Sequence, residues 1–217
     1  MTATHNLALV KKHVEASAVA SGRDPDAVTI VVVTKARTVD EIRELYDAGH
    51  RDFGENRSQE LTKKQPGLPG DIRWHFVGPL QSNKVRHVRP IVSLLHSMDR
   101  ASLAAAWVKG PGTPPPALLE INIGREDQKA GVSPESARDE AADMIDLGVD
   151  LHGVMAIPPN IEEPSQYFEE LVAIRDALAS EWPQMKEVSA GMSQDYHLAV
   201  RAGATIVRPG RAIFDRH

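Results

Sequence analysis

The chain contains no cysteine among its 217 residues. This absence excludes a disulfide scaffold, a thiolate nucleophile and any metal site with cysteine ligands. It fits a reducing compartment, and we expect the protein to act in the cytoplasm. No apolar run is long enough to span a bilayer, and the N-terminus lacks the pattern of a signal peptide. We therefore expect a globular protein without a membrane partner.

An excess of basic residues is also missing. The chain has 25 Lys and Arg against 30 Asp and Glu, which gives a formal charge of −5. A nucleic-acid-binding protein usually carries a basic face, so we expect no nucleic-acid partner. The motifs HExxH, GxxxxGK[ST], GxGxxG and GxSxG are absent as well. A zinc hydrolase, a nucleotide hydrolase, a dinucleotide-binding fold and a serine hydrolase therefore have no motif support.

Short apolar runs rich in β-branched residues recur along the whole chain. Such runs are typical of strands covered on both faces. The predicted strands are Val28–Thr34, Arg51–Gly54, Ile72–Val77, Ile91–His96, Ala117–Ile123, Leu151–Ile157, Lys186–Ala190 and Ala204–Arg208.

Helical patterns separate these strands. Asp40 and Glu41 suit a first helical turn, and Ser133 followed by Pro134 is typical of a helix start. The predicted helices are Asn6–Ser21, Val39–Ala48, Arg57–Lys64, Gln81–Val88, Ala101–Val108, Pro134–Leu147, Pro164–Glu181 and Gln194–Ala202.

Strands that alternate with helices indicate parallel βαβ units. Eight such units predict an α/β fold, a single (β/α)8 barrel of the TIM type spanning residues 1–217. A doubly wound open sheet is the alternative. The Pro/Gly-rich stretch Gly110–Pro116 lies between a predicted helix and a predicted strand. We interpret it as a stiff surface loop and not as a domain boundary.

The C-terminal ends of barrel strands are where ligands bind. Lys35 ends the first predicted strand. A free lysine amine can attack an aldehyde and form a Schiff base. The plainer alternative is a lysine that extends into solvent from the end of its strand.

The loops after the last two strands contain a candidate phosphate site. Arg208, Gly210 and Arg211 follow the eighth predicted strand, in a region where barrels often bind phosphate. Ser193 follows the seventh strand and can donate its hydroxyl to a phosphate. The alternatives are an ordinary Pro-Gly turn and a helix-capping serine.

Four further side chains lie at or near predicted strand ends. Asn56 can contact a ligand or cap the following helix. His75 is a candidate base or a core histidine, and Met155 and Ser189 line the mouth or fill the core. Together these residues predict a barrel with an amine nucleophile and a phosphate cradle opposite it. Pyridoxal 5′-phosphate and a sugar phosphate of the aldolase type both satisfy this arrangement.

The sequence resembles the pyridoxal phosphate homeostasis proteins over nearly its whole length. The combination of WHFVGPLQSNK with FGEN is the most specific part of the resemblance. The motifs that carry it are VVVTKA around Lys35, DFGENRSQE at Asp52–Glu60, WHFVGPLQSNK at Trp74–Lys84, HSMDR at His96–Arg100, INI…KAG across Ile121–Gly131, GVMAI at Gly153–Ile157, SAGMSQD at Ser189–Asp195 and VRPGRAIF at Val207–Phe214.

The resemblance implies a barrel like that of alanine racemase, with Lys35 carrying pyridoxal phosphate as an internal aldimine. It implies that Ser193 and the Gly210–Arg211 turn bind the phosphate, and that Arg208 lies beside the pyridine nitrogen. The other residues implied to line the cofactor are Asn56, His75, Met155, Ser189 and Met192.

The sequence departs from the family pattern at two positions. Pro209 replaces an aliphatic residue, and Arg211 replaces the Thr or Ser whose hydroxyl would bind the phosphate. Arg211 can substitute a charge-assisted hydrogen bond.

The resemblance implies binding without robust turnover. Alanine racemase takes a second base, a tyrosine, from an extra domain, and we expect none here. Tyr46, Tyr167 and Tyr196 all fall in predicted helices. We therefore predict a monomeric carrier that buffers pyridoxal phosphate inside the cell, with cofactor-dependent apo-enzymes as candidate partners. A racemase-like enzyme and a barrel that has lost its cofactor remain as alternatives.

Overall fold

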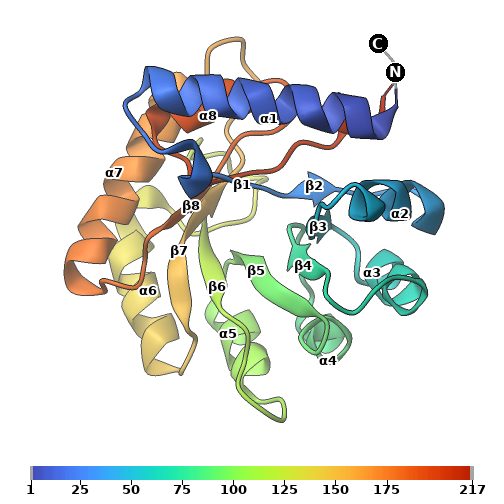
Figure 1. Cartoon of the computed structure of the whole chain (residues 1–217). Coiled ribbons are helices and arrows are strands. Elements are labelled where there is room, and N and C mark those ends of the chain that lie inside the picture. The colour runs from blue at the N-terminus through green and yellow to red at the C-terminus, as the bar shows by residue number, and fades with distance from the viewer. Residues whose placement is uncertain (1, 216–217) are drawn as a thin grey trace.

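The computed structural model describes residues 2–215, and its strands form one sheet that curls into a nearly closed barrel (Figure 1). All neighbouring strands in this sheet run parallel. The predicted barrel is therefore confirmed, and the open doubly wound sheet is not formed. The strands are β1 (Thr29–Ile30), β2 (Val32–Val33), β3 (Asp52–Glu55), β4 (Arg73–Phe76), β5 (Val92–Met98), β6 (Ala117–Ile121), β7 (Leu151–Ala156), β8 (Glu187–Ser189) and β9 (Ile206–Val207).

The first predicted strand, Val28–Thr34, is divided into β1 and β2, and this division closes the barrel. Thr29 in β1 pairs with Ile206 in the last strand. Val33 in β2 pairs with Gly54 in β3. One extended segment therefore bridges the two edges of the sheet, with its first half on one edge and its second half on the other.

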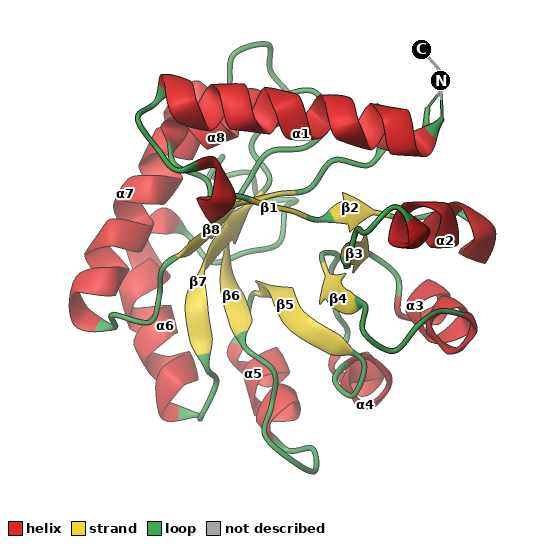
Figure 2. Cartoon of the chain, in the orientation of Figure 1, coloured by secondary structure: helices red, strands yellow, loops and turns green. Residues whose placement is uncertain are grey.

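Helices surround the barrel on the outside (Figure 2). Ser133 accepts the backbone N–H of Ser136 at 3.1 Å, so the predicted cap is confirmed, although it caps a 3-10 turn that precedes the α-helix. The predicted helix Gln81–Val88 is a 3-10 turn followed by one α-helical turn. The helices are α1 (Ala3–Ala20), α2 (Val39–Asp47), α3 (Ser58–Lys64), α4 (Val85–Val88), α5 (Ala101–Val108), α6 (Ala137–Asp146), α7 (Ser165–Glu181), α8 (Tyr196–Ala202) and α9 (Arg211–Phe214).

Helix α1 lies across the side of the barrel where β1 is found, beside α8 (Figure 1). Its buried apolar residues Leu7, Val10, Val14 and Ala18 recur every three or four positions, which places them on one face of the helix. The side-chain amide of Asn6 donates to the carbonyl of Ile213 at 2.9 Å. The N-terminal helix is thereby fixed to the segment that follows the last strand.

The barrel interior combines apolar and polar side chains. A small apolar cluster is formed by Val31, Leu94, Leu118, Met155 and Ile206, separate from the larger core between sheet and helices. The described part of the chain contains no helix that is both long and apolar enough to cross a membrane.

Candidate functional site

Lys35 and Asn56 follow two neighbouring strands at the C-terminal end of the barrel. Lys35 comes after β2 and is exposed, and Asn56 comes after β3 and is half-buried. The Oδ1 atom of Asn56 is buried and has no hydrogen-bond partner. Buried polar atoms are normally satisfied, so an unpaired acceptor beside the exposed lysine marks this end of the barrel as a candidate binding site.

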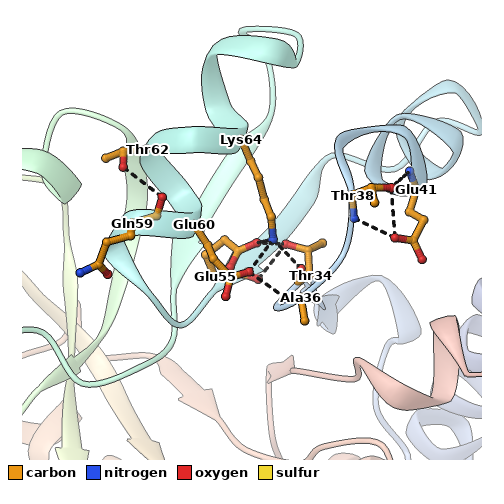
Figure 3. Close-up of polar contacts among 10 residues, drawn as sticks. Thr34, Ala36, Thr38, Glu41, Glu55, Gln59, Glu60, Thr62 and Lys64 are labelled. Atoms are coloured by element: carbon orange, nitrogen blue, oxygen red, sulfur yellow. Dashed lines mark hydrogen bonds and ion pairs between the residues drawn. The ribbon is translucent and has the colours of Figure 1, made fainter.

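A buried ionic cluster holds the backbone just before Lys35. Lys64 extends from α3 into this cluster (Figure 3). Its ammonium group donates to the carbonyl of Thr34 at 2.8 Å, to Glu55 Oε1 at 2.6 Å and to Glu60 Oε2 at 2.8 Å. The Thr34 hydroxyl donates to the same Glu55 oxygen at 2.6 Å. The residue that precedes the lysine is therefore fixed through both its main chain and its side chain.

The backbone just after Lys35 has an uncommon conformation. Ala36 has a φ of 58°, in the left-handed region that residues with a Cβ rarely adopt. Its N–H donates to Glu60 Oε2 at 2.8 Å, so the same cluster stabilises this side (Figure 3). Strained backbone of this kind concentrates at functional sites. Lys35 thus projects from a segment held on both sides.

The turn after β9 lies beside the strand that carries Lys35. The N–H of Val33 donates to the carbonyl of Pro209 at 2.9 Å. A Cβ on Gly210 would lie 3.1 Å from the Val33 carbonyl oxygen, so glycine permits this close approach. The candidate amine and the candidate phosphate turn are therefore neighbours. The expectation that they face each other across the mouth is wrong, because closure of the barrel places the last strand against the first.

Ser193 is joined to the same turn. Its Oγ accepts the N–H of Gly210 at 3.1 Å and the N–H of Ala212 at 3.0 Å. Both lone pairs of the hydroxyl are then used, and its hydrogen is free to donate. Arg211 is exposed at the start of α9. The side chain of Met192 is 39% exposed, and no hydrogen bond connects it to the turn.

Arg208 brings a positive charge into the barrel interior. It is only 4% exposed, and its guanidinium donates to Ser189 Oγ at 2.5 Å and to the carbonyl of Ala156 at 3.0 Å. Burial lowers the pKa of Arg208 to about 10, against the opposing effects of Glu120 and Asp195. The group remains a cation near neutral pH, and its hydrogen bonds to Ser189 and Ala156 fix its orientation.

A chain of hydrogen bonds runs from Arg208 through the barrel to Asp52. Ser189 Oγ contacts His96 Nδ1 at 2.8 Å, and His96 Nε2 contacts His75 Nδ1 at 3.0 Å. His75 Nε2 contacts Asp52 Oδ1 at 3.3 Å. Sequence reasoning did not select His96, although it lies in the HSMDR motif, because it interrupts an apolar strand without any recognisable catalytic spacing.

The donors and acceptors of this chain point in one direction. Burial alone would raise the pKa of Asp52, but hydrogen bonds from His75 and Arg73 hold it well below its usual value. The ionised carboxylate only accepts, so His75 donates to it from Nε2.

The same reasoning fixes the next two groups. Burial, with the charge of Arg208, holds the pKa of His96 well below its ordinary value, so this ring is neutral and has one donor and one acceptor. Among the described residues Ser189 Oγ contacts His96 and Arg208, and a guanidinium cannot accept, so the hydroxyl hydrogen is donated to His96 Nδ1. The neutral His96 ring then donates from Nε2 to His75 Nδ1. Since a guanidinium can only donate, Ser189 accepts from Arg208. Every polar group between Arg208 and Asp52 is thereby satisfied.

These contacts place two predicted residues inside the barrel. Both ring nitrogens of His75 are used within the hydrogen-bonded chain, and His75 reaches Arg208 only through His96 and Ser189. Met155 is 1% exposed within the interior apolar cluster. Their described neighbours are interior side chains, whereas Lys35 is open to solvent.

Glu120 is a further interior group that sequence reasoning missed. Burial raises its pKa to about 7; Asp99 adds to the rise, while Arg208 and Arg100 oppose it. The sequence feature that could have identified it is a carboxylate within the otherwise apolar strand β6. This residue balances the charge of Arg208 only when it is ionised.

Replacement of Glu120 by glutamine is expected to raise the free energy of unfolding by about 2 kcal/mol at pH 8, with a much smaller gain at pH 5. The carboxyl titrates near 4.5 when unfolded and near 7 when folded, so the folded state binds more protons between these values. Stability from this group is therefore lost as pH rises through that window. Urea unfolding at both pH values, with the exposed Glu169→Gln as control, measures the difference. Equal gains at pH 5 and pH 8 would contradict the prediction.

Comparison with known proteins agrees with this geometry. Residues 3–216 match the family described as alanine racemase, N-terminal domain. The pyridoxal phosphate homeostasis protein of Aquifex aeolicus is 36% identical over 223 residues, covering 99% of this chain and 98% of that protein. The protein of the same name from Escherichia coli strain K12 is 37% identical, covering 97% of this chain and 94% of the relative.

A solved structure extends the comparison. PipY of Synechococcus elongatus PCC7942, with PLP bound, has a TM-score of 0.82 and 31% identity, covering 98% of this chain and 100% of PipY. The fold and the site thus define a barrel of the alanine racemase N-terminal type. Within that class, the chain belongs to the family of pyridoxal phosphate homeostasis proteins.

Proposed function

We propose that this protein binds pyridoxal 5′-phosphate through an imine with Lys35 and buffers it in the cell without robust catalytic turnover. The observation that most directly supports this proposal is the hydrogen bond between Val33 and Pro209. It sets the strand that bears the exposed amine beside the Arg208–Gly210 turn. An amine next to an anion-binding turn suits an aldehyde that carries a phosphate. PipY, whose structure has PLP bound, supports the same cofactor.

The residues of the mouth fit this cofactor. The free hydrogen of Ser193, the glycine turn at Gly210 and the charge of Arg211 are proposed to bind the phosphate. Arg211 supplies a charge-assisted hydrogen bond where the family pattern has a hydroxyl. Arg208 is proposed to face the pyridine nitrogen. Because it is a cation and holds no proton acceptor, it keeps that nitrogen unprotonated.

The remaining predicted residues line the site from the neighbouring strands. The unpaired Oδ1 of Asn56 is available to a bound donor. Ser189 and His75 act through the hydrogen-bonded chain that orients Arg208, and Met155 forms the apolar floor. Met192 lies on the exposed loop before Ser193. Bound pyridoxal phosphate supplies a reactive aldehyde, which the proposed role withholds from other amines.

The positions of two tyrosines support binding over turnover. The Tyr196 hydroxyl contacts His13 Nδ1 of α1 at 2.9 Å, and the Tyr46 hydroxyl donates to Asp71 at 2.6 Å. Both hydroxyls are occupied by contacts with other elements, so neither is placed as a second base for racemisation. The proposal includes cytoplasmic location, a monomer, and cofactor-dependent apo-enzymes as recipients of the cofactor.

The experiment that tests the proposal is an absorbance spectrum of the purified protein before and after addition of pyridoxal phosphate. Borohydride reduction and peptide mass mapping follow on the same sample. We expect an imine band and a phosphopyridoxyl adduct on Lys35. Lys35→Ala is expected to lose both, and the exposed control Lys63→Ala to keep both. Absence of the band, or an adduct only on other lysines, would overturn the proposal.

A further inference from the structure

A pocket lies beside α4 in the outer ring of helices. This helix is only one turn long, whereas its neighbour α5 has two turns (Figure 1). The pocket, of about 870 Å³, lies between them and is within the size range of small-molecule sites. It is closed on one side by the Pro/Gly-rich loop at 110–115. None of the residues assigned above to the cofactor lines this pocket.

Four cations line the pocket, and no acidic residue does: Lys84, Arg86, Arg89 and Lys109. None of the four forms an ion pair with a carboxylate within residues 2–215. This is unusual in a chain whose net charge is −5. A hollow lined by charges of one sign concentrates the electric field and attracts ions of the opposite sign.

Arg89 is the buried member of this group. It is 6% exposed, and its guanidinium donates to the carbonyls of Pro111 at 2.8 Å and Gly112 at 2.6 Å. Its Nε is buried without a partner. Carbonyls carry no net charge, so the positive charge of Arg89 is not neutralised. A Cβ on Gly110 would collide with this guanidinium, so a glycine at this loop position permits the burial of Arg89.

The rest of the wall is apolar. Val85, Pro90, Val92, Ala106 and Pro115 contribute hydrocarbon surface between the cationic groups. Apolar walls with a few polar groups are typical of sites for small organic molecules. The pocket is also lined by Ser82–Lys84, the end of the WHFVGPLQSNK motif. None of these three residues is assigned to the cofactor site.

We propose that the pocket between α4 and α5 is a second binding site, distinct from the mouth of the barrel, for a small organic anion with an apolar ring. The unpaired cations bind the acidic group, and the apolar wall covers the ring. The site is independent of the proposed function at Lys35.

The test uses 8-anilinonaphthalene-1-sulfonate, an anion with aromatic rings, and the neutral 1-anilinonaphthalene, in fluorescence titrations of the full chain. We expect the sulfonate to bind, and the double variant Lys84→Gln/Lys109→Gln to weaken this binding about fivefold. The matched double variant Lys12→Gln/Lys186→Gln removes two exposed charges outside the pocket. It is expected to bind the sulfonate like the unchanged protein.

Four results would overturn the proposal. The first is no binding of the sulfonate, and the second is equal weakening by both double variants. The third is a loss of fluorescence per molecule as protein concentration rises, which would assign the pocket to a second copy of the chain. The fourth is a weakening of 1-anilinonaphthalene binding in the Lys84/Lys109 double variant that equals the weakening of sulfonate binding. That result would show that charge is not the cause.

Discussion

Replacement of Lys64 by methionine is expected to lower the free energy of unfolding by about 3–5 kcal/mol, because it leaves the buried carboxylate of Glu55 without its cation. The ammonium group of Lys64 is the partner of Glu55 and Glu60 and also binds the Thr34 carbonyl. Glu55 is fully buried, and its second oxygen already lacks a partner. Few single contacts in this protein combine so much burial with so much charge.

Urea unfolding at pH 7 measures this effect, and the chain offers a matched control. Lys63 precedes Lys64 in the same helix but is exposed. Lys63→Met removes the same charge and is expected to change stability by less than about 0.5 kcal/mol. Adding Glu55→Gln to Lys64→Met is expected to recover part of the loss. If Lys64→Met were as stable as Lys63→Met, the buried cluster would have no energetic role.

Replacement of His96 by leucine is expected to cost about 3 kcal/mol of stability and to weaken pyridoxal phosphate binding. Leucine removes one acceptor and one donor from the middle of the hydrogen-bonded chain, which leaves the Ser189 hydroxyl hydrogen and His75 Nδ1 each without a partner. A buried polar group left without its partner costs about 1–3 kcal/mol. Arg208 then loses the fixed orientation of the hydroxyl that accepts from it.

A glutamine at the same position separates orientation from simple packing. Its amide N–H can donate to His75 while its carbonyl accepts from Ser189, which reproduces the two roles of the histidine ring. We therefore expect His96→Gln to keep most of the stability and cofactor affinity lost in His96→Leu. The measurements are urea unfolding of the cofactor-free protein and titration of the imine absorbance. Equal losses in the two variants would contradict the directional chain.

The order of the elements could be predicted from the sequence because each strand is covered on both faces. The apolar runs at Val28–Thr34 and Leu151–Ile157 predicted the strand positions, and Ser133 with Pro134 predicted the start of a helix. The division of the first strand was not predictable in this way. It results from pairing with both edges of the closed sheet, which is a tertiary effect.

The site was predicted in part for a similar reason. Lys35 was predicted because a charged residue directly after an apolar strand can be recognised in the linear sequence. His96 and Glu120 act through Ser189 in β8 and Arg208 just after β9, and no local spacing indicates such partners. The buried role of Lys64 was equally hidden, since Lys63 and Lys64 look alike in sequence and only packing distinguishes them.

The pairing of β1 with β9 also affects when the protein becomes functional during its synthesis. Lys35 is translated before β9 and the turn at Pro209, which pair with the segment that leads to the lysine. Until then a nascent chain exposes an unpaired sheet edge, a feature that invites wrong pairing and chaperone binding. Under the proposed function, capture of an aldehyde would require translation to have passed Pro209, because a chain that terminates before it would carry the lysine without the turn beside it.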